Sequence, residues 1–249
     1  MPSSPTLVLA VHGSAVPAAA ATVGRLCDAV EAMSGVRPVV GHLDIQRPSL
    51  GQALDHLAQA ARERAVVVPL LLGNGFHRTI DIPALVAKPR PLPVSLTAGL
   101  AGEQDIALAL YGRLREAESL AGGGRADAVV VASAGSSRDG GNDGARTAVA
   151  QLHTLLEAER GTVPVLPAYC SAAEPTVPDT VQRLRDAGYR RVAVATHLLA
   201  PGRFTRALAG VGAWAVAEPL ADHPRVARVV LRRYEAAVRS EVRVVGVAG

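Results

Sequence analysis

The fold predicted for this chain rests first on one N-terminal segment, Leu7-Val8-Leu9-Ala10-Val11-His12-Gly13-Ser14. Its apolar run is short, rich in Val and Leu and closed by a glycine, which is typical of a parallel strand buried on both faces. A second such run, Val67-Val68-Pro69-Leu70-Leu71-Leu72, leads through Gly73-Asn74-Gly75-Phe76 to His77. Ligands of parallel sheets bind beyond the carboxyl ends of the strands. We therefore expect His12 and His77 to meet at one edge of a sheet.

The chain repeats this pattern in its second half. Ala134-Gly135-Ser136 follows another Val-rich run, 122 residues after His12-Gly13-Ser14. The segment Leu70-Leu71-Leu72-Gly73-Asn74-Gly75 aligns with His197-Leu198-Leu199-Ala200-Pro201-Gly202, 127 residues later. Between the copies, Ala121-Gly122-Gly123-Gly124-Arg125 has the composition of a flexible connector. The repeat indicates an internal duplication.

Strand-like runs alternate with helical patterns in both copies, which predicts parallel sheets with helices on both faces. The fold class is α/β, with two flavodoxin-like, doubly wound domains and a cleft between them. Residues 1–121 form the expected N-terminal domain with the metal site, 122–126 a Gly-rich linker and 127–249 a degenerate C-terminal copy. Helices are expected in both copies, at residues 17–33, 48–64, from Asp81 onward, 103–121, 143–159, 177–187 and 224–239.

Proline and aspartate mark three of the expected helix starts. Pro17 and Pro48 would lie in a first turn, where the missing N–H is harmless. Asp81, just before Ile82-Pro83, would be an N-cap. The helix at 103–121 would close the first unit.

The composition excludes several classes of protein. The net charge is +4, yet there is no basic run and aromatic residues make up only 3%, so nucleic acid is not an expected partner. No apolar stretch approaches the roughly 18 residues of a membrane helix, and we expect neither a signal peptide nor a membrane partner. Cys27 and Cys170 stand alone and far apart, which argues against a disulfide framework. We expect a cytoplasmic protein.

Arginine dominates the basic residues, because Lys88 is the only lysine among the 26 Lys and Arg. This bias has two explanations that the sequence leaves open. It reflects codon usage in an Ala/Arg/Val/Gly-rich genome, or it serves bidentate capture of carboxylates on an anionic small molecule.

The duplication gives the two histidines weight as functional residues. At their aligned positions the second copy carries Ala134 and Phe204. A folding role should persist in both copies, whereas a chemical role is needed once. Asp44 ends a third strand-like run, so its carboxylate either accepts an N–H from an imidazole or from substrate at the same edge or caps the helix that follows.

The remaining histidines are interpreted as structural or solvated, including His42 and His197, which lie in strand-like runs. The sequence has no Gly-x-x-x-x-Gly-Lys-Ser/Thr motif, so a phosphate-binding loop for ATP is missing. Chemistry that depends on ATP is therefore not expected.

Four motifs occur in order along the chain: His12-Gly13-Ser14, Leu43-Asp44-Ile45-Gln46-Arg47-Pro48, Pro69-Leu70-Leu71-Leu72, and His77-Arg78-Thr79-Ile80-Asp81-Ile82-Pro83. Together they resemble the small, ATP-independent class II chelatases that act on sirohydrochlorin. The resemblance spans nearly the whole chain, since longer members of that family are internal duplications too. In the second half, Thr196-His197-Leu198-Leu199-Ala200-Pro201-Gly202 looks like their C-terminal halves.

This resemblance implies a macrocycle bound between the domains, with His12 and His77 holding the incoming metal. Asp44 stands where the family carries an acidic residue. The chain departs from the pattern at two places. Ala15 replaces the arginine that usually follows His-Gly-Ser, and the glycine-rich 73–75 segment before His77 would loosen that loop.

The implied activity is insertion of Fe²⁺, or next Co²⁺, into sirohydrochlorin or a related tetrapyrrole, for siroheme, haem or cobalamin. Neutral imidazole suits Fe²⁺, Co²⁺ and Ni²⁺ and can also accept a proton. No permanently bound cofactor is expected; the partners are the tetrapyrrole and the metal, and the protein would be a monomer or homodimer. The expected substrate contacts are Ser14, Gly75, Arg78, Arg138 and Arg203.

Two alternatives remain open at this stage. A metal or tetrapyrrole carrier would bind the same ligands, retain product tightly and show no turnover. A different α/β enzyme would use the histidines for acid–base chemistry without metal, and chelators would not affect it.

Overall fold

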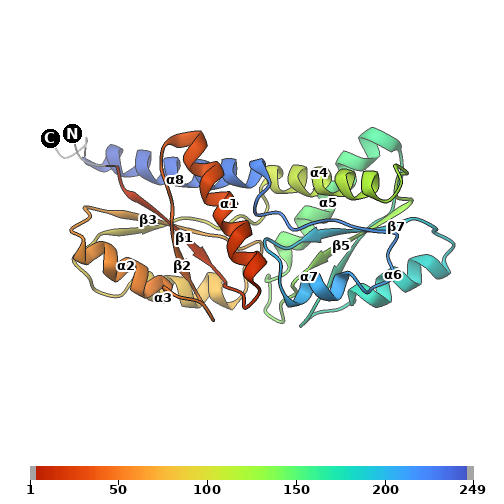
Figure 1. Ribbon diagram of the computed structural model, residues 1–249, viewed down its shortest axis with the longest axis horizontal. Coiled ribbons are helices and arrows are strands. Elements are labelled where there is room, and N and C mark those ends of the chain that lie inside the picture. The colour runs from red at the N-terminus through yellow and green to blue at the C-terminus, as the bar shows by residue number, and fades with distance from the viewer. Residues whose placement is uncertain (1–3, 246–249) are drawn as a thin grey trace.

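The computed structural model of the protein describes residues 4–245 and contains two parallel sheets that lie end to end (Figure 1). The strand orders are β2-β1-β3-β4 and β6-β5-β7-β8, so one topology occurs twice. The predicted pair of doubly wound units is confirmed. The strands are β1 (Thr6–Val11), β2 (Val39–His42), β3 (Ala65–Pro69), β4 (Val94–Leu96), β5 (Ala128–Ser133), β6 (Val165–Tyr169), β7 (Val192–His197) and β8 (Ala215–Val216).

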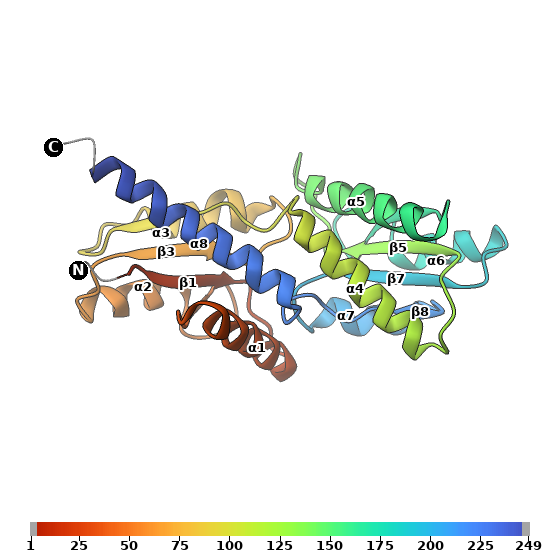
Figure 2. The same ribbon diagram turned by 90° about the horizontal axis from the view of Figure 1, so that it is seen from above.

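Helices connect the strands and cover both faces of each sheet (Figures 1 and 2). They are α1 (Pro17–Ser34), α2 (Leu50–Gln59), the π-helical turn η1 (His77–Asp81), α3 (Ile82–Val86), α4 (Gln104–Leu120), α5 (Asp143–Arg160), α6 (Val177–Asp186), α7 (Arg203–Leu208) and α8 (Pro224–Val245). Within residues 4–245 no helix combines the length and apolarity of a membrane span.

The strands are buried on both faces, as their continuous apolar runs predict. In β1, Leu7 and Leu9 pack into a core that extends across both sheets, whereas Val8 and Ala10 pack against α2 and α3. All four are fully buried. Burying a Val or Leu side chain is worth roughly 1.5–3 kcal/mol, so these alternating contacts fix the sheet between two helical layers.

Helix α2 begins later than expected. Its first residue is Leu50 rather than Pro48, and Ser49 is the N-cap. The backbone N–H of Gln52 donates to Ser49 Oγ at 3.2 Å, and the Ser49 N–H donates to Gln52 Oε1 at 3.0 Å. This capping box satisfies the first turn. Pro48 lies outside the helix, after a cis peptide bond with Arg47.

The helix expected to start at Asp81 is observed as α3, which begins at Ile82, but a π-helical turn precedes it and Asp81 does not cap it with its side chain. The chain turns helical at His77, and Asp81 makes no capping hydrogen bond. His77 and Asp81 therefore share one face of the same turn, which the N-cap interpretation would not allow.

The last helix of each sequence repeat covers the sheet of the other repeat. Helix α4, expected to close the first unit, packs against α5, β7 and β8 of the second. Helix α8 returns to the first unit and packs on α1 and β3 (Figure 2). The two helices cross, and the Asp105 carboxylate of α4 accepts from Arg225 of α8 at 2.8 Å. The expectation for α4 is wrong because its apolar face does not specify which sheet it covers.

The duplication extends to the loops. Ile45 and Ala172, 127 residues apart, both have positive φ, at 61° and 56°. Gly13 and Gly135 adopt φ of 93° and 91° at equivalent turns after β1 and β5. Both halves therefore present the same backbone at the carboxyl ends of their strands, and they differ in the side chains placed there.

Candidate active site

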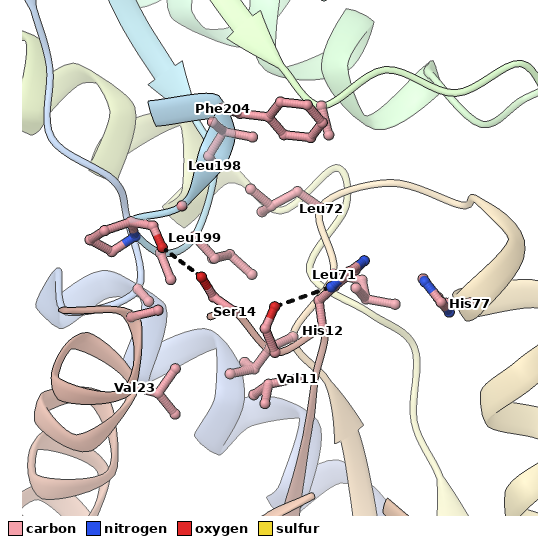
Figure 3. A pocket seen from close by; sticks show the side chains of 18 of the residues that line it. Val11, His12, Ser14, Val23, Leu71, Leu72, His77, Leu198, Leu199 and Phe204 are labelled. Atoms are coloured by element: carbon pink, nitrogen blue, oxygen red, sulfur yellow. Dashed lines mark hydrogen bonds between the residues drawn. The ribbon is translucent and has the colours of Figure 1, made fainter. Parts of the chain in front are cut away.

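His12 and His77 converge at the edge of the first sheet. His12 follows β1 and His77 begins η1 after β3, the strand that pairs with β1 in parallel. The ring centroids lie 4.9 Å apart with the planes at 90°. Figure 3 shows the rings approaching one another from these two elements. The convergence expected from the strand ends is observed.

A carboxylate orients one of the two rings. Asp81 Oδ2 lies 2.6 Å from Nδ1 of His77, one helical turn away. Both side chains are about a third exposed, at 34% and 33%. With Nδ1 hydrogen-bonded, Nε2 of His77 is the nitrogen left to take a ligand.

The Asp44 carboxylate does not contact either imidazole. Its side chain is exposed, and Oδ1 accepts from the Ile45 N–H at 2.8 Å. No hydrogen bond joins it to either imidazole in residues 4–245. The capping alternative is wrong as well, since Ser49 caps α2. Sequence reasoning missed Asp81 in this position, although its spacing of four residues from His77 fits one helical face.

The backbone of Asp44 nevertheless fixes His12. The Asp44 N–H donates to the His12 carbonyl at 3.0 Å. At Gly13 a side chain would overlap the Asp44 carbonyl oxygen, and φ is +93°. Nδ1 of His12 lies 3.2 Å from the Gly13 carbonyl oxygen. Only glycine fits this turn, which directs an exposed imidazole off the end of β1.

A cavity of about 1000 Å³ lies between the two halves and contains both rings on its wall. The N-terminal half contributes His12, Ser14, Gly75 and His77, and the C-terminal half contributes His197, Arg203 and Phe204. Between these polar groups the wall is apolar; Figure 3 labels Val11, Val23, Leu71, Leu72, Leu198 and Leu199. Such a space suits a large organic ligand that is mostly apolar and carries a few polar groups.

The predicted substrate contacts in the N-terminal half differ in availability. Ser14 lines the cavity and its Oγ donates to the Pro201 carbonyl of the other half at 3.4 Å (Figure 3). Gly75 also lines it. Arg78 borders the cavity, but its Nη2 donates to the Thr97 carbonyl at 3.4 Å. The carboxylate contact expected of Arg78 therefore has no support in its present orientation.

The two predicted arginines of the C-terminal half each stack on a phenylalanine. Arg203 lines the cavity and its guanidinium lies 4.9 Å from the Phe204 ring centroid. Arg138 does not line the cavity, and its guanidinium lies over Phe76 at 5.7 Å. The chain has only these two phenylalanines, which sequence reasoning did not assign to the site.

The C-terminal half carries no equivalent imidazole pair. Ala134 and Phe204 occupy the aligned positions and line the same cavity. His197 is buried, and its Nδ1 lies 2.9 Å from Ser133 Oγ. Burial lowers the pKa of His197 to about 4, so this imidazole is neutral at pH 7. The structural interpretation of His197 agrees with this environment.

Two duplicated α/β units with an imidazole pair on the wall of the cavity between them define a class of two-unit α/β proteins with one site where the units meet. The chain belongs to the CbiX family. A sequence model of that family matches residues 6–117 and, a second time, residues 128–237. The family resemblance and the internal duplication inferred from the sequence are confirmed.

Curated relatives match only part of the chain. The sirohydrochlorin cobaltochelatase of Methanocaldococcus jannaschii is 33% identical over 82 residues, which is 32% of this chain and 57% of the relative. That of Methanopyrus kandleri is 32% identical over 81 residues, again 32% of this chain and 57% of the relative. The chain thus spans little more than half the length of these relatives.

Solved structures share the whole architecture. SirB from Bacillus subtilis with Fe³⁺ has a TM-score of 0.73 at 20% identity, covering 94% of this chain and 95% of that one. The sirohydrochlorin chelatase SirB from Bacillus subtilis subspecies spizizenii in complex with cobalt has a TM-score of 0.70 at 19% identity, with 95% and 96% covered. CbiX, described as the terminal enzyme of siroheme biosynthesis in denitrifying bacteria, has 0.64 at 17%, with 93% and 99% covered. At these identities the likeness establishes the fold.

Proposed function

We propose that the protein inserts a divalent metal ion, Fe²⁺ or Co²⁺, into sirohydrochlorin or a closely related tetrapyrrole. The observation that carries the proposal is the pair of imidazoles, 4.9 Å apart, on the wall of a cavity of about 1000 Å³. The names of the relatives support the same reaction class, since those matched by sequence are sirohydrochlorin cobaltochelatases.

Two protein ligands, and not more, suit a metal ion that must leave the protein for the macrocycle. In the part of the chain that the structure describes, His, Cys, Asp and Glu side chains form no group of three or more arranged to hold a metal. His12 and His77 would hold the ion and leave its other positions to water and then to the pyrrole nitrogens. Neutral imidazole is a suitable ligand for Fe²⁺ and Co²⁺.

The same imidazoles account for the proton balance. Insertion replaces two pyrrole N–H bonds with bonds to the metal, so two protons must leave. As each imidazole releases the ion, its nitrogen regains a lone pair and can accept one of these protons. The Asp81 carboxylate lies beside Nδ1 of His77, which leaves Nε2 of that ring to accept the proton. His12 is exposed and can pass its proton to water.

Arg203 at the cavity wall and Arg138 near His77 would supply partners for the carboxylates of the macrocycle. Arg203 is exposed on the wall, and Arg138 extends from the C-terminal half to Phe76, next to His77. Bidentate pairing of such groups with carboxylates is strong and directional. The chain also supplies both walls of the cavity, so a monomer is sufficient for the reaction. The unpaired Cys27 and Cys170 suit a reducing cytoplasm.

An anaerobic assay tests the proposal. Purified protein is mixed with sirohydrochlorin and either Fe²⁺ or Co²⁺, and the absorbance of the macrocycle is followed over many equivalents of substrate. We expect repeated turnover without ATP and its loss in the double variant His12→Ala/His77→Ala. The faster of the two ions identifies the preferred metal.

The assay also separates the alternatives. A carrier would bind one equivalent of macrocycle or metal and then stop, with the product retained. A metal-independent acid–base enzyme would leave the macrocycle spectrum unchanged with either ion. Either result overturns the chelatase proposal.

A further inference from the structure

The loop that leads to His77 is wedged against the C-terminal half. A side chain built on Gly144, the second residue of α5, would overlap the carbonyl oxygen of Leu72. From the loop side of the same contact, a Cβ built on Gly73 would lie 2.9 Å from the Gly141 carbonyl oxygen. The glycine-rich segment before His77 is therefore packed closely against another backbone.

A short path connects this contact to His77. The Gly75 carbonyl accepts from the Arg78 N–H at 3.1 Å and from the Thr79 N–H at 3.2 Å. These bonds close the first turn of η1 around His77. Because Gly75 accepts hydrogen bonds from this turn, a shift of residues 72–75 would also move the backbone of His77 and hence its imidazole.

A second contact from the C-terminal half reaches the residue beside His77. The Arg138 guanidinium lies 5.7 Å from the Phe76 ring centroid, and the Phe76 and His77 ring centroids are 6.3 Å apart. The backbone of Arg138 is held in its own loop, because its N–H donates to Ser136 Oγ at 3.2 Å and its carbonyl accepts from Gly141 at 3.0 Å. This contact independently restrains the turn that carries His77.

We infer that the C-terminal half, which carries neither imidazole, positions His77 for metal binding, and that Gly144 is the residue on which this depends. The inference rests on the proposed metal role of His77. Because β3 ends at Pro69, the segment between the strand and η1 lies outside the sheet. The close approach of α5, which only glycine at position 144 permits, limits how far that segment can move.

Binding of Co²⁺ alone, without macrocycle, tests the inference in the full chain. Gly144→Ala should weaken Co²⁺ binding by at least about tenfold, as loss of a group that orients a ligand typically does. Its Co²⁺ absorption spectrum should shift toward that of His77→Ala. The matched control is Gly51→Ala, also at the second position of a helix, where the nearest atom lies 3.8 Å from the added Cβ. Gly51→Ala should bind Co²⁺ as the wild type does.

The Co²⁺ measurements separate the metal role of His77 from the positioning role of Gly144. If His77→Ala itself binds Co²⁺ normally, the proposed metal site is wrong. If His77→Ala loses Co²⁺ but folded Gly144→Ala keeps wild-type affinity and spectrum, the positioning role is overturned. If Gly144→Ala fails to fold, Gly73→Ala is used instead, because its added Cβ meets the Gly141 carbonyl oxygen and should displace the same loop. This variant should then bind Co²⁺ more weakly than the wild type. Normal binding by folded Gly73→Ala would then overturn the inference.

Discussion

Nδ1 of His77 and Oδ2 of Asp81 are 2.6 Å apart across a single π-helical turn. The carboxylate selects which nitrogen of the imidazole faces the cavity, and it compensates positive charge when that ring binds a cation or a proton. The acidic partner of His77 thus comes from the same turn as His77 itself, and not from the neighbouring strand end.

Replacing Asp81 should therefore impair the site more than replacing Asp44. Asp81→Asn keeps the shape but removes the charge, and we expect metal affinity or turnover to fall by about 10–100-fold. Asp44→Asn changes an exposed group with no bond to either ring and should have a small effect. Anaerobic Co²⁺ titration and chelatase rates check both variants. A larger loss in Asp44→Asn than in Asp81→Asn would show that the site closes differently around the metal.

Loss of either imidazole should abolish most metal insertion without unfolding the protein. His12 is exposed and His77 is partly exposed, so His12→Ala and His77→Ala remove little packing. Thermal unfolding should stay close to that of the wild type while turnover drops. His153, a partly exposed histidine on α5, gives the control variant His153→Ala, which should retain activity. Near-normal turnover in either site variant contradicts the ligand assignment.

The protein should bind one metal equivalent. The second half has the same backbone turn after β5, but Ala134 and Phe204 lie where ligands would be needed. Titration with Co²⁺ under anaerobic conditions measures the stoichiometry. Two sites of equal affinity would mean that the C-terminal half holds a metal by other groups.

Arg203→Gln should weaken macrocycle binding and spare metal binding. Its guanidinium lines the cavity and has no carboxylate partner among the described ion pairs. Loss of one charge-assisted contact is worth about 1.5–3 kcal/mol, or roughly 10–100-fold in KM for sirohydrochlorin. Steady-state kinetics at saturating metal measure KM and kcat separately. An unchanged KM with reduced kcat would place Arg203 outside the carboxylate contacts.

Acid should destabilise the fold through His197. Burial lowers its folded pKa to about 4, whereas the unfolded value is near 6.5, so the unfolded chain binds the proton more tightly. Stability is unaffected above about pH 6.5 and falls as the pH drops toward 4. Over that window the loss amounts to roughly 3 kcal/mol, at about 1.4 kcal/mol for each pH unit.

The repeat itself supplies a matched control for this effect. Ser133 and His197 align with Val11 and Leu70 of the first half, so Ser133→Val/His197→Leu copies an apolar pair that the same fold already accommodates. Urea unfolding between pH 7 and 4 should show the wild type losing stability relative to the double variant. Parallel pH curves for the two proteins would rule out His197 as the cause.

The sequence was sufficient for the sheets and for the imidazole pair. Runs such as Leu7–Val11 are apolar at every position because both faces of a parallel sheet are buried, and the end of each run places the next residue at the ligand edge. His12 follows directly from this rule, and His77 follows from it once the loop after β3 is included. The start of α2 was also accessible, since Ser49 and Gln52 have the spacing of a capping box.

Other features depend on contacts that no local pattern contains. The role of Asp81 follows from η1 starting at His77, and that start depends on the Gly75 carbonyl and on the packing of the preceding loop against α5. The stacking of Arg138 on Phe76 joins residues from different halves of the chain. Periodicity identifies the apolar face of α4 but does not specify its partner sheet.

The crossing of α4 and α8 means that the repeat in the sequence and the compact unit in space have different boundaries. A cut in the glycine-rich connector would leave each fragment without the helix that covers its sheet, exposing Leu110 and Leu114 on one side and Val226 and Val230 on the other. The compact unit that carries the imidazole pair is therefore discontinuous in sequence. It consists of the residues before 104 together with α8, which covers the first sheet. A fragment that keeps the first unit intact must therefore contain α8 as well as the N-terminal residues.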